Sequence, residues 1–439
     1  MVLGKIGTAT RFAGIAVAGA VALGGGAAQA QKVKMAVPSF LTGAAAAAFG
    51  IPAKQGAELV INAINKGELP APYNSKGIGG RQIEPIYFDE SGGNTKQVTE
   101  LRNKVEKDHV DVVAGYVSSG TCAAIAPVAE ELKVLTIMGI CGTPRVFQEI
   151  DKDPKYVFRT LNIATANNVS AARYIARHYK SKVKGFIGIN QNYAWGQDSM
   201  RDFALAMKTL VPKAEESNNN QFPKIFSGQY GTEISAIQRS KENLVHSSFW
   251  GGDLEAFIGQ ASARGLFKRK MVLLTVGETS AYRLGKKFPQ GIMVGTRGPY
   301  GMYVVDDPTP LNQWFQKAYR KAYGIAPSQP GYQYGQAVLA AKFAYDKAAK
   351  AAGKFPTTDQ VIAALAGSTV PTFVGNVQMG RAKGHQGLTD DRWGITTWSK
   401  KKNEMVLKNI DIFPSTCVNP PAGMTSEEWL KSGMKGAKC

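Results

Sequence analysis

Short apolar runs and segments of helical period alternate along the first third of the chain. The runs predict β-strands over 32–37, 82–88, 110–114 and 134–138, and apolar residues at helical spacing predict helices over 53–65, 95–107 and 123–132. Strands separated by helices imply parallel pairing through right-handed crossovers. This part of the chain therefore predicts a doubly wound α/β unit.

The same alternation then starts again. Helices are predicted over 164–179 and 198–210 and from Glu233 and Leu254, and strands over 183–189, 226–230, 244–250 and 271–276. Two consecutive α/β units of similar plan predict two lobes. Lobes of this kind bind ligands in the crevice at the carboxyl ends of their strands.

The last third has a different order of elements. Long helical stretches at 310–323 and 335–351 and a shorter one at 358–365 precede strand-like runs at 373–378 and 393–398. Such late segments can return to complete each lobe, which gives three crossings between the lobes. We predict a first lobe of 31–159 and 298–385, and a second lobe of 160–297 and 386–439 that includes the C-terminal tail.

The first thirty residues have the layout of a secretory signal peptide. Lys5 and Arg11 give a positive start, 12–23 is an uncharged apolar run, and 28–30 offers a small-x-small cleavage pattern. A retained membrane anchor is the less favoured alternative, because the apolar run is short for a hydrocarbon core of about 30 Å. We therefore expect a mature chain that starts near Gln31, outside the cytoplasm.

The net charge of +20 suggests an anionic ligand, an anionic membrane surface or nucleic acid. The basic residues are scattered, however, and the densest cluster, 400–402, follows a strand-like run and is typical of a solvated turn. We therefore expect no nucleic-acid partner.

Four cysteines in an oxidising compartment predict two disulfides. Three pairings are open, of which Cys122 with Cys141 and Cys417 with Cys439 is the most local. Because Cys122 is the first cysteine, none follows the cleavage site to carry a lipid, and we expect a freely diffusing monomer.

Motifs of catalysis are missing. The sequence has no G-x-S-x-G elbow, P-loop, G-x-G-x-x-G or H-E-x-x-H pattern. Asp89 and Glu90 follow a strand, where a solvated loop is favoured over a pair of acting carboxylates. The histidines are far apart and show no metal-ligand spacing: His109, His178, His246 and His385. We therefore predict no catalytic residue, no metal and no cofactor, and a secreted hydrolase remains the alternative of another class.

Four segments, in order, resemble the periplasmic binding proteins of branched-chain amino acid ABC transporters. They are 38–65 with Leu-Thr-Gly at 41–43, 114–128 with Ser-Ser-Gly-Thr at 118–121, Tyr-Ala-Trp-Gly-Gln at 193–197, and 248–266. The resemblance implies the type I periplasmic binding protein fold, in which two lobes joined by three hinge crossings close on a ligand. It also implies a periplasmic location, a small-molecule ligand and delivery to an ABC permease in the inner membrane.

Ser118 and Ser119 lie between the strand at 110–114 and the next helix. Their hydroxyls and the free N–H groups of a helix start can hold a carboxylate. Simple N-capping is the alternative, and the resemblance favours ligand contact. It also implies that the loop after the next strand contacts an amino-acid backbone, through Cys141, Gly142 and Thr143.

The resemblance further places aromatic residues around the ligand at Phe49, Trp195 and Trp250, and pairs a ligand ammonium with Glu278. The chain departs from the best-known members because the loop at 91–94 has no cysteine, while Cys141 lies in the ligand loop itself. Two tryptophans also make a larger, flatter wall than a small aliphatic side chain needs. The predicted ligand is a hydrophobic or branched-chain amino acid, with an aromatic carboxylate, an amide or urea as the alternative.

Overall fold

The computed structural model describes residues 1–5, 7–9 and 31–439. The apolar run and cleavage pattern of the predicted signal peptide fall on 10–30, outside the described residues. Residues Lys32–Cys439 form one compact unit. Among the described helices, none combines the length and the apolar character that crossing a membrane requires.

The first lobe is built on an eight-stranded sheet in the order β11-β12-β13-β5-β4-β3-β1-β2. Neighbouring strands from β13 to β2 pair in parallel, and β11 and β12 add an antiparallel edge. Its strands are β1 (Val33–Ser39), β2 (Ile83–Asp89), β3 (Val112–Gly115), β4 (Leu135–Met138), β5 (Val157–Arg159), β11 (Thr369–Pro371), β12 (Asn376–Arg381) and β13 (Gln386–Leu388).

The second lobe is built on a seven-stranded sheet in the order β15-β14-β10-β9-β8-β6-β7. The strands from β10 to β7 are parallel, and β14 and β15 form an antiparallel hairpin at the edge. Its strands are β6 (Gly185–Gly188), β7 (Glu215–Glu216), β8 (Leu244–Ser247), β9 (Met271–Leu274), β10 (Met293–Thr296), β14 (Asp391–Ser399) and β15 (Glu404–Phe413).

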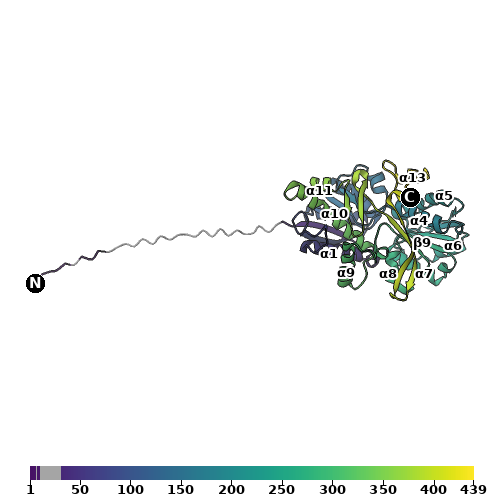
Figure 1. Cartoon of the computed structure of the whole chain (residues 1–439), viewed down its shortest axis with the longest axis horizontal. Helices are drawn as coiled ribbons and strands as arrows, with labels where there is room; N and C mark the ends of the chain where they lie inside the picture. Colours follow the sequence, from purple (N-terminus) through teal and green to yellow (C-terminus); the bar gives the residue numbers. More distant parts are fainter. Residues whose placement is uncertain (6, 10–30) are drawn as a thin grey trace. The chain divides into compact units, whose positions relative to one another are not determined.

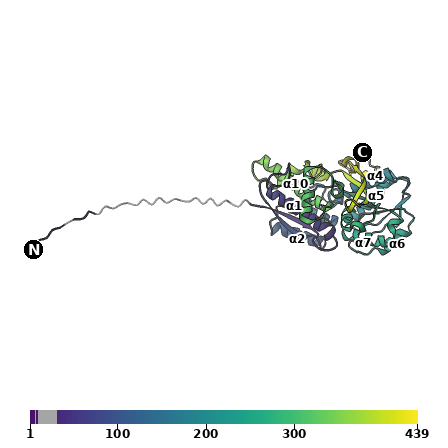
Figure 2. The ribbon, with the colours of Figure 1, turned by 60° about the horizontal axis from the view of Figure 1, so that its bottom comes forward.

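Helices alternate with the parallel strands, as the pattern predicts, and further helices follow β10 and β15. The described α-helices are α1 (Ile51–Lys66), α2 (Asn94–Glu106), α3 (Ser119–Glu131), α4 (Ala164–His178), α5 (Ala194–Leu210), α6 (Gly231–Arg239), α7 (Gly251–Ala263), α8 (Glu278–Leu284), α9 (Pro310–Tyr323), α10 (Gln329–Ala352), α11 (Thr358–Leu365), α12 (Ser415–Val418) and α13 (Ser426–Lys431). Figures 1 and 2 show α1 and α10 in one lobe and α4 to α7 in the other. The fold is thus the predicted type I periplasmic binding protein fold.

The chain passes between the two sheets three times: after β5, after β10 and after β13. The last passage differs from the predicted boundary between residues 385 and 386. Gln386 pairs with Arg159 of β5, so β13 belongs to the first sheet and the chain crosses only after Leu388. The segment Gln-Gly-Leu is too short and has too few apolar residues to predict a strand from its sequence.

Local sequence explains where the long helices begin and end. Pro52 lies in the first turn of α1, where its missing N–H costs nothing, and Gly67 closes the helix in the left-handed conformation with φ 73°. Pro330 starts α10 in the same way, so this helix begins six residues before the predicted 335. α10 is buried along most of its length and packs against α1.

The structure tests two expectations about loops and strands, and it contradicts the first and confirms the second. Residues 226–230 form no strand: Phe226 has a φ of 61°, and its amide donates to the Asp253 carboxylate at 2.7 Å. Residues 400–402 form the exposed turn between β14 and β15, as predicted for a solvated basic cluster.

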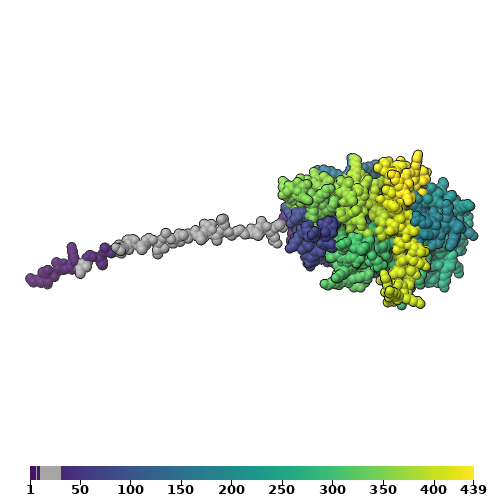
Figure 3. Space-filling model, viewed as in Figure 1, coloured from purple at the N-terminus to yellow at the C-terminus, as the bar shows by residue number. Residues whose placement is uncertain are grey.

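The C-terminal tail is anchored on the second lobe. Trp429 of α13 is fully buried, and α13 packs against α5. Disulfides join Cys417 to Cys439 in this tail and Cys122 to Cys141 in the first lobe, which is the most local of the three pairings. In the space-filling view, the yellow C-terminal residues form a continuous band over the visible face (Figure 3).

Candidate ligand-binding site

A small cavity lies where the carboxyl ends of the two sheets face each other. The first lobe contributes the loops after β3 and β4 and the short helical turn Ala46–Gly50, and the second contributes the loops after β6, β8, β9 and β10. The lining residues are Phe49, Val117, Ser119, Ile140, Gly142, Tyr193, Trp195, Trp250, Val276 and Arg297. The cavity leaves only about 20 Å³, room for about one water molecule.

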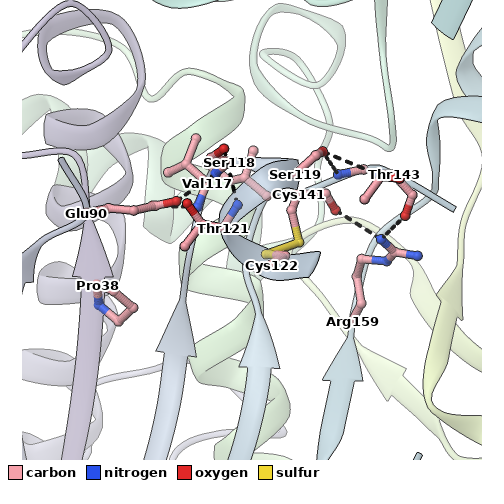
Figure 4. Close-up of a disulfide and its surroundings, with 12 residues drawn as sticks. Pro38, Glu90, Val117, Ser118, Ser119, Thr121, Cys122, Cys141, Thr143 and Arg159 are labelled. Carbon is pink, nitrogen blue, oxygen red and sulfur yellow. Dashed lines mark hydrogen bonds between the residues drawn. A yellow bond between two sulfur atoms is a disulfide. The ribbon is translucent and has the colours of Figure 1, made fainter. Parts of the chain in front are cut away.

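The serine loop is held by contacts within the protein (Figure 4). The Ser118 hydroxyl accepts the Thr121 amide at 3.5 Å and caps α3. The Ser119 hydroxyl accepts the amides of Gly142 and Thr143 at 3.1 and 3.2 Å, and this serine lines the cavity. Capping therefore accounts for Ser118, while Ser119 joins two loops of the site.

The Glu90 carboxylate accepts two backbone N–H groups of the serine loop, where the sequence predicts the carboxylate of a ligand. Its carboxylate accepts the amides of Val117 and Ser118 at 2.7 and 2.8 Å. The side chain is buried, which corrects the expectation of a solvated loop, and burial raises its pKa to about 7. Glu90 lines a second cavity of about 360 Å³, which also contains Ser118 and Phe226, and Tyr193 lies between the two cavities.

An aromatic wall surrounds the central cavity. The Trp250 indole N–H donates to the Tyr193 hydroxyl at 2.7 Å, and the Trp195 indole N–H donates to the Ser248 carbonyl at 2.9 Å. The rings of Phe49 and Trp250 meet edge to face with centroids 5.3 Å apart. Since Phe49 comes from the first lobe and Trp250 from the second, this contact closes the cleft.

Arg297 is the cation of the site, and sequence analysis missed it. Its side chain is buried, donates to the carbonyls of Ile140 and Asn162 at 2.6 and 3.2 Å, and lies 4.8 Å from the Trp195 ring centroid. It forms no ion pair with a described residue, and its Nε atom has no hydrogen-bond partner there. Burial lowers its pKa to about 10, so it remains charged at neutral pH.

Two further predicted site residues, Glu278 and Cys141, do not line the central cavity. Glu278 is the first residue of α8, and its carboxylate accepts the amides of Met302 and Gln329 at 3.0 and 3.1 Å. It is buried beside the second crossing and does not line the cavity, so the structure does not place it where an ammonium partner is expected. Cys141 is taken up in the disulfide, next to the site.

Thr143 and its neighbour Arg145 connect the two lobes. The Thr143 hydroxyl donates to the Asp198 carboxylate of α5 at 2.6 Å, and Arg145 forms an ion pair with the same carboxylate at 2.8 Å. Asp198 is fully buried. The arrangement can therefore hold the lobes in the closed position.

Gly142 is required by close packing. A Cβ atom at this position would collide with the Arg297 guanidinium and the Trp195 ring. No cluster of three or more potential metal ligands occurs within the described part of the chain.

Two α/β lobes with an enclosed cavity between their strand ends define a class of binding proteins that close around a ligand. Residues 32–403 match the periplasmic binding protein family, and the chain belongs to that family. A curated relative is the leucine-, isoleucine-, valine-, threonine- and alanine-binding protein of Pseudomonas aeruginosa, 25% identical over 64% of this chain and 70% of the relative.

Solved structures share the fold. A solute-binding protein of an ABC transporter from Rhodopseudomonas palustris, in complex with 3,4-dihydroxybenzoic acid, superposes with a TM-score of 0.73 at 18% identity over 88% of this chain and 98% of that chain. A leucine-binding protein from Thermotoga maritima superposes with a TM-score of 0.69 at 16% identity over 86% of this chain and 98% of that chain.

Proposed function

We propose that the protein captures a small carboxylate-bearing solute in the periplasm and delivers it to an ABC permease in the inner membrane. The observation that carries this proposal is Arg297, a buried cation that lines the central cavity and forms no ion pair with a described residue. A buried charge is costly unless it is paired, and a guanidinium binds a carboxylate through two parallel hydrogen bonds. The proposal assigns no catalytic step to the protein.

An aromatic carboxylate is the ligand that the walls of the central cavity match best, once the lobes have opened to admit it. Phe49, Trp195 and Trp250 line this cavity together with Arg297, and no aspartate or glutamate is among the described residues that line it. An ammonium group there would lie beside a cation without a carboxylate to pair with it. The Rhodopseudomonas palustris protein, which shares the fold, was solved with an aromatic acid, and this agrees with the proposed class of ligand.

A hydrophobic amino acid is the second candidate. It is favoured by Glu90, whose buried carboxylate lines the neighbouring cavity that Tyr193 shares with the central one. The Pseudomonas aeruginosa relative, a leucine-, isoleucine-, valine-, threonine- and alanine-binding protein, supports the same class of ligand. In this case Arg297 would hold the ligand carboxylate and Glu90 its ammonium.

Calorimetry with benzoate, 4-hydroxybenzoate and leucine tests the proposal. We expect saturable binding of an aromatic acid and at least a tenfold loss in Arg297→Gln, because hydrogen bonds to charged groups contribute about 1.5–3 kcal/mol. Arg173→Gln is the matched control, since Arg173 is partly buried and likewise donates to a carbonyl, that of Cys417 at 3.2 Å, away from the cleft. Unchanged affinity in Arg297→Gln would overturn the proposal.

Leucine binding without aromatic-acid binding would select the second candidate, and Glu90→Gln should then weaken leucine binding. For the compartment, we propose that export removes the first thirty residues. N-terminal sequencing of protein recovered from the periplasm should find a start near Gln31, and an intact Met1 there would contradict this.

A further inference from the structure

A further cavity, here called the hinge cavity, lies beside the hinge and apart from the ligand cleft, and the cations in its walls form no ion pair with a described residue. Its volume is about 230 Å³, and its walls include Arg159, Arg381, Lys152 and Gln386. The loop after β4 separates it from the cleft, because Arg159 donates to the Thr143 carbonyl at 2.7 Å on one side while Gly142 faces Arg297 on the other. The cavity therefore differs from the site to which we assign solute binding.

The two arginines are fixed by neutral partners. Arg159 is buried and donates through Nε to the Gln386 side chain at 2.7 Å and through Nη1 to backbone carbonyls, with Nη2 left without a hydrogen bond to a described residue. Arg381 donates through Nη2 to the Met424 carbonyl at 2.6 Å. Figure 4 shows the Arg159 guanidinium below the loop with its bonds to Cys141 and Thr143.

Negative charge is missing from this cavity. No aspartate or glutamate is among the residues that line it, and neither arginine nor Lys152 forms an ion pair with a described residue. Burial and the nearby charges of Arg297 and Arg381 lower the pKa of Arg159 to about 9. Two partly buried arginines elsewhere, Arg145 and Arg201, do have carboxylate partners in Asp198 and Asp202.

We propose that the hinge cavity binds a free inorganic oxyanion with two negative charges, phosphate or sulfate, between Arg159 and Arg381, with Lys152 at its rim. Guanidinium groups match the oxygen geometry of such anions. The volume is several times the roughly 30 Å³ that one water takes in the liquid, so a four-oxygen anion fits with some water.

The cavity is lined by segments at the hinge crossings, so an anion bound there would contact the hinge. Arg159 ends β5 at the first crossing, Gln386 starts β13 just before the third, and Met424 belongs to the tail that leads to α13 on the second lobe. An anion held here would contact segments of both lobes. The proposal does not rest on the identity of the solute in the cleft.

Titration calorimetry with inorganic phosphate and with sulfate, at constant ionic strength, tests the site. We expect saturable binding of at least one of the two, weakened tenfold or more in Arg381→Gln and less in Lys152→Gln. Lys400→Gln, in the exposed turn, is the matched control for loss of one charge and should bind as the wild type does. Arg297→Gln removes a neighbouring positive charge but no group that lines this cavity, so it should weaken the binding less than Arg381→Gln does.

A second variant keeps both arginines and protects the test against misfolding. Met424→Glu places a carboxylate among the cations, so it should abolish phosphate and sulfate binding and raise the melting temperature of the anion-free protein. Absence of saturable binding in the wild type would overturn the proposal. Full affinity in Arg381→Gln and Met424→Glu, or binding that disappears only in Arg297→Gln, would overturn it as well.

Discussion

Ser118 and Ser119 are neighbours in sequence, yet their hydroxyls serve different elements. Ser119→Ala leaves the buried amides of Gly142 and Thr143 without their acceptor, which costs about 1–3 kcal/mol of unfolding free energy. Because the same loop faces the cavity, affinity for the aromatic acid should fall too. Urea unfolding and calorimetry on the same preparation measure both effects.

Ser118→Ala is the matched control for this substitution. It removes an N-cap and should lower stability by about 0.5–2 kcal/mol while affinity stays within twofold. Equal losses of affinity in the two variants would contradict the division of roles and return both hydroxyls to the ligand.

Glu278 makes the stability of the protein depend on pH. Burial raises the pKa of its carboxyl from 4.5 to about 7, so between these values the unfolded chain has released the proton that the folded chain still binds. Stability therefore falls as the pH rises through this window. Glu278→Gln stays uncharged and should lose less stability between about pH 5 and pH 7, as measured by urea unfolding.

Affinity gives the Glu278→Gln variant a second readout. Since Glu278 does not line the cavity, the variant should bind the solute as the wild type does. Glu68→Gln, at an exposed position, controls for the loss of one carboxylate and should keep the wild-type pH profile. A tenfold loss of affinity in Glu278→Gln would instead restore this residue as the partner of a ligand ammonium.

At the scale of elements, helical period predicted the structure most accurately. The helices α9 and α11 have the predicted bounds, because each has a clear apolar face between a defined start and end. The segment at 226–230 misled because its aromatic residues resemble a strand. In the structure, Phe226 instead has a positive φ and its amide is bound by Asp253, a contact 27 positions away.

Arg297 was not predicted as a site residue because β10, the strand directly before it, has a weak sequence signal. This strand is four residues long and contains Gly295, which weakens a strand signal. The glycine is needed because a Cβ atom there would collide with the Trp393 ring of β14, a partner that sequence cannot reveal. Once β10 is known, a charged residue directly after a parallel strand becomes a site candidate. The aromatic residues and the serine loop were predicted from family-like motifs, and the structure places Phe49, Trp195, Trp250 and Ser119 in the lining of the cavity.

At the scale of the whole molecule, the small cavity and the contacts between the lobes describe a closed form. A solute larger than a water can enter only when the lobes separate, because the central cavity leaves about 20 Å³. The contacts that must open include the ring contact of Phe49 with Trp250 and the bonds from Thr143 and Arg145 to Asp198.

We therefore predict that Asp198 sets how far the protein is closed before a solute binds. Asp198→Asn removes the ion pair with Arg145 across the cleft, so the solute-free variant should populate open forms and show a larger radius of gyration in X-ray scattering. Saturating aromatic acid should bring both proteins to the same smaller radius, with weaker affinity in the variant because part of the binding free energy is spent on closure.

Asp253→Asn is the matched control, since this buried aspartate bonds to Gln191 and Phe226 within the second lobe. If the two variants scatter alike, or if solute leaves the radius of the wild type unchanged, the contacts at Asp198 do not control closure.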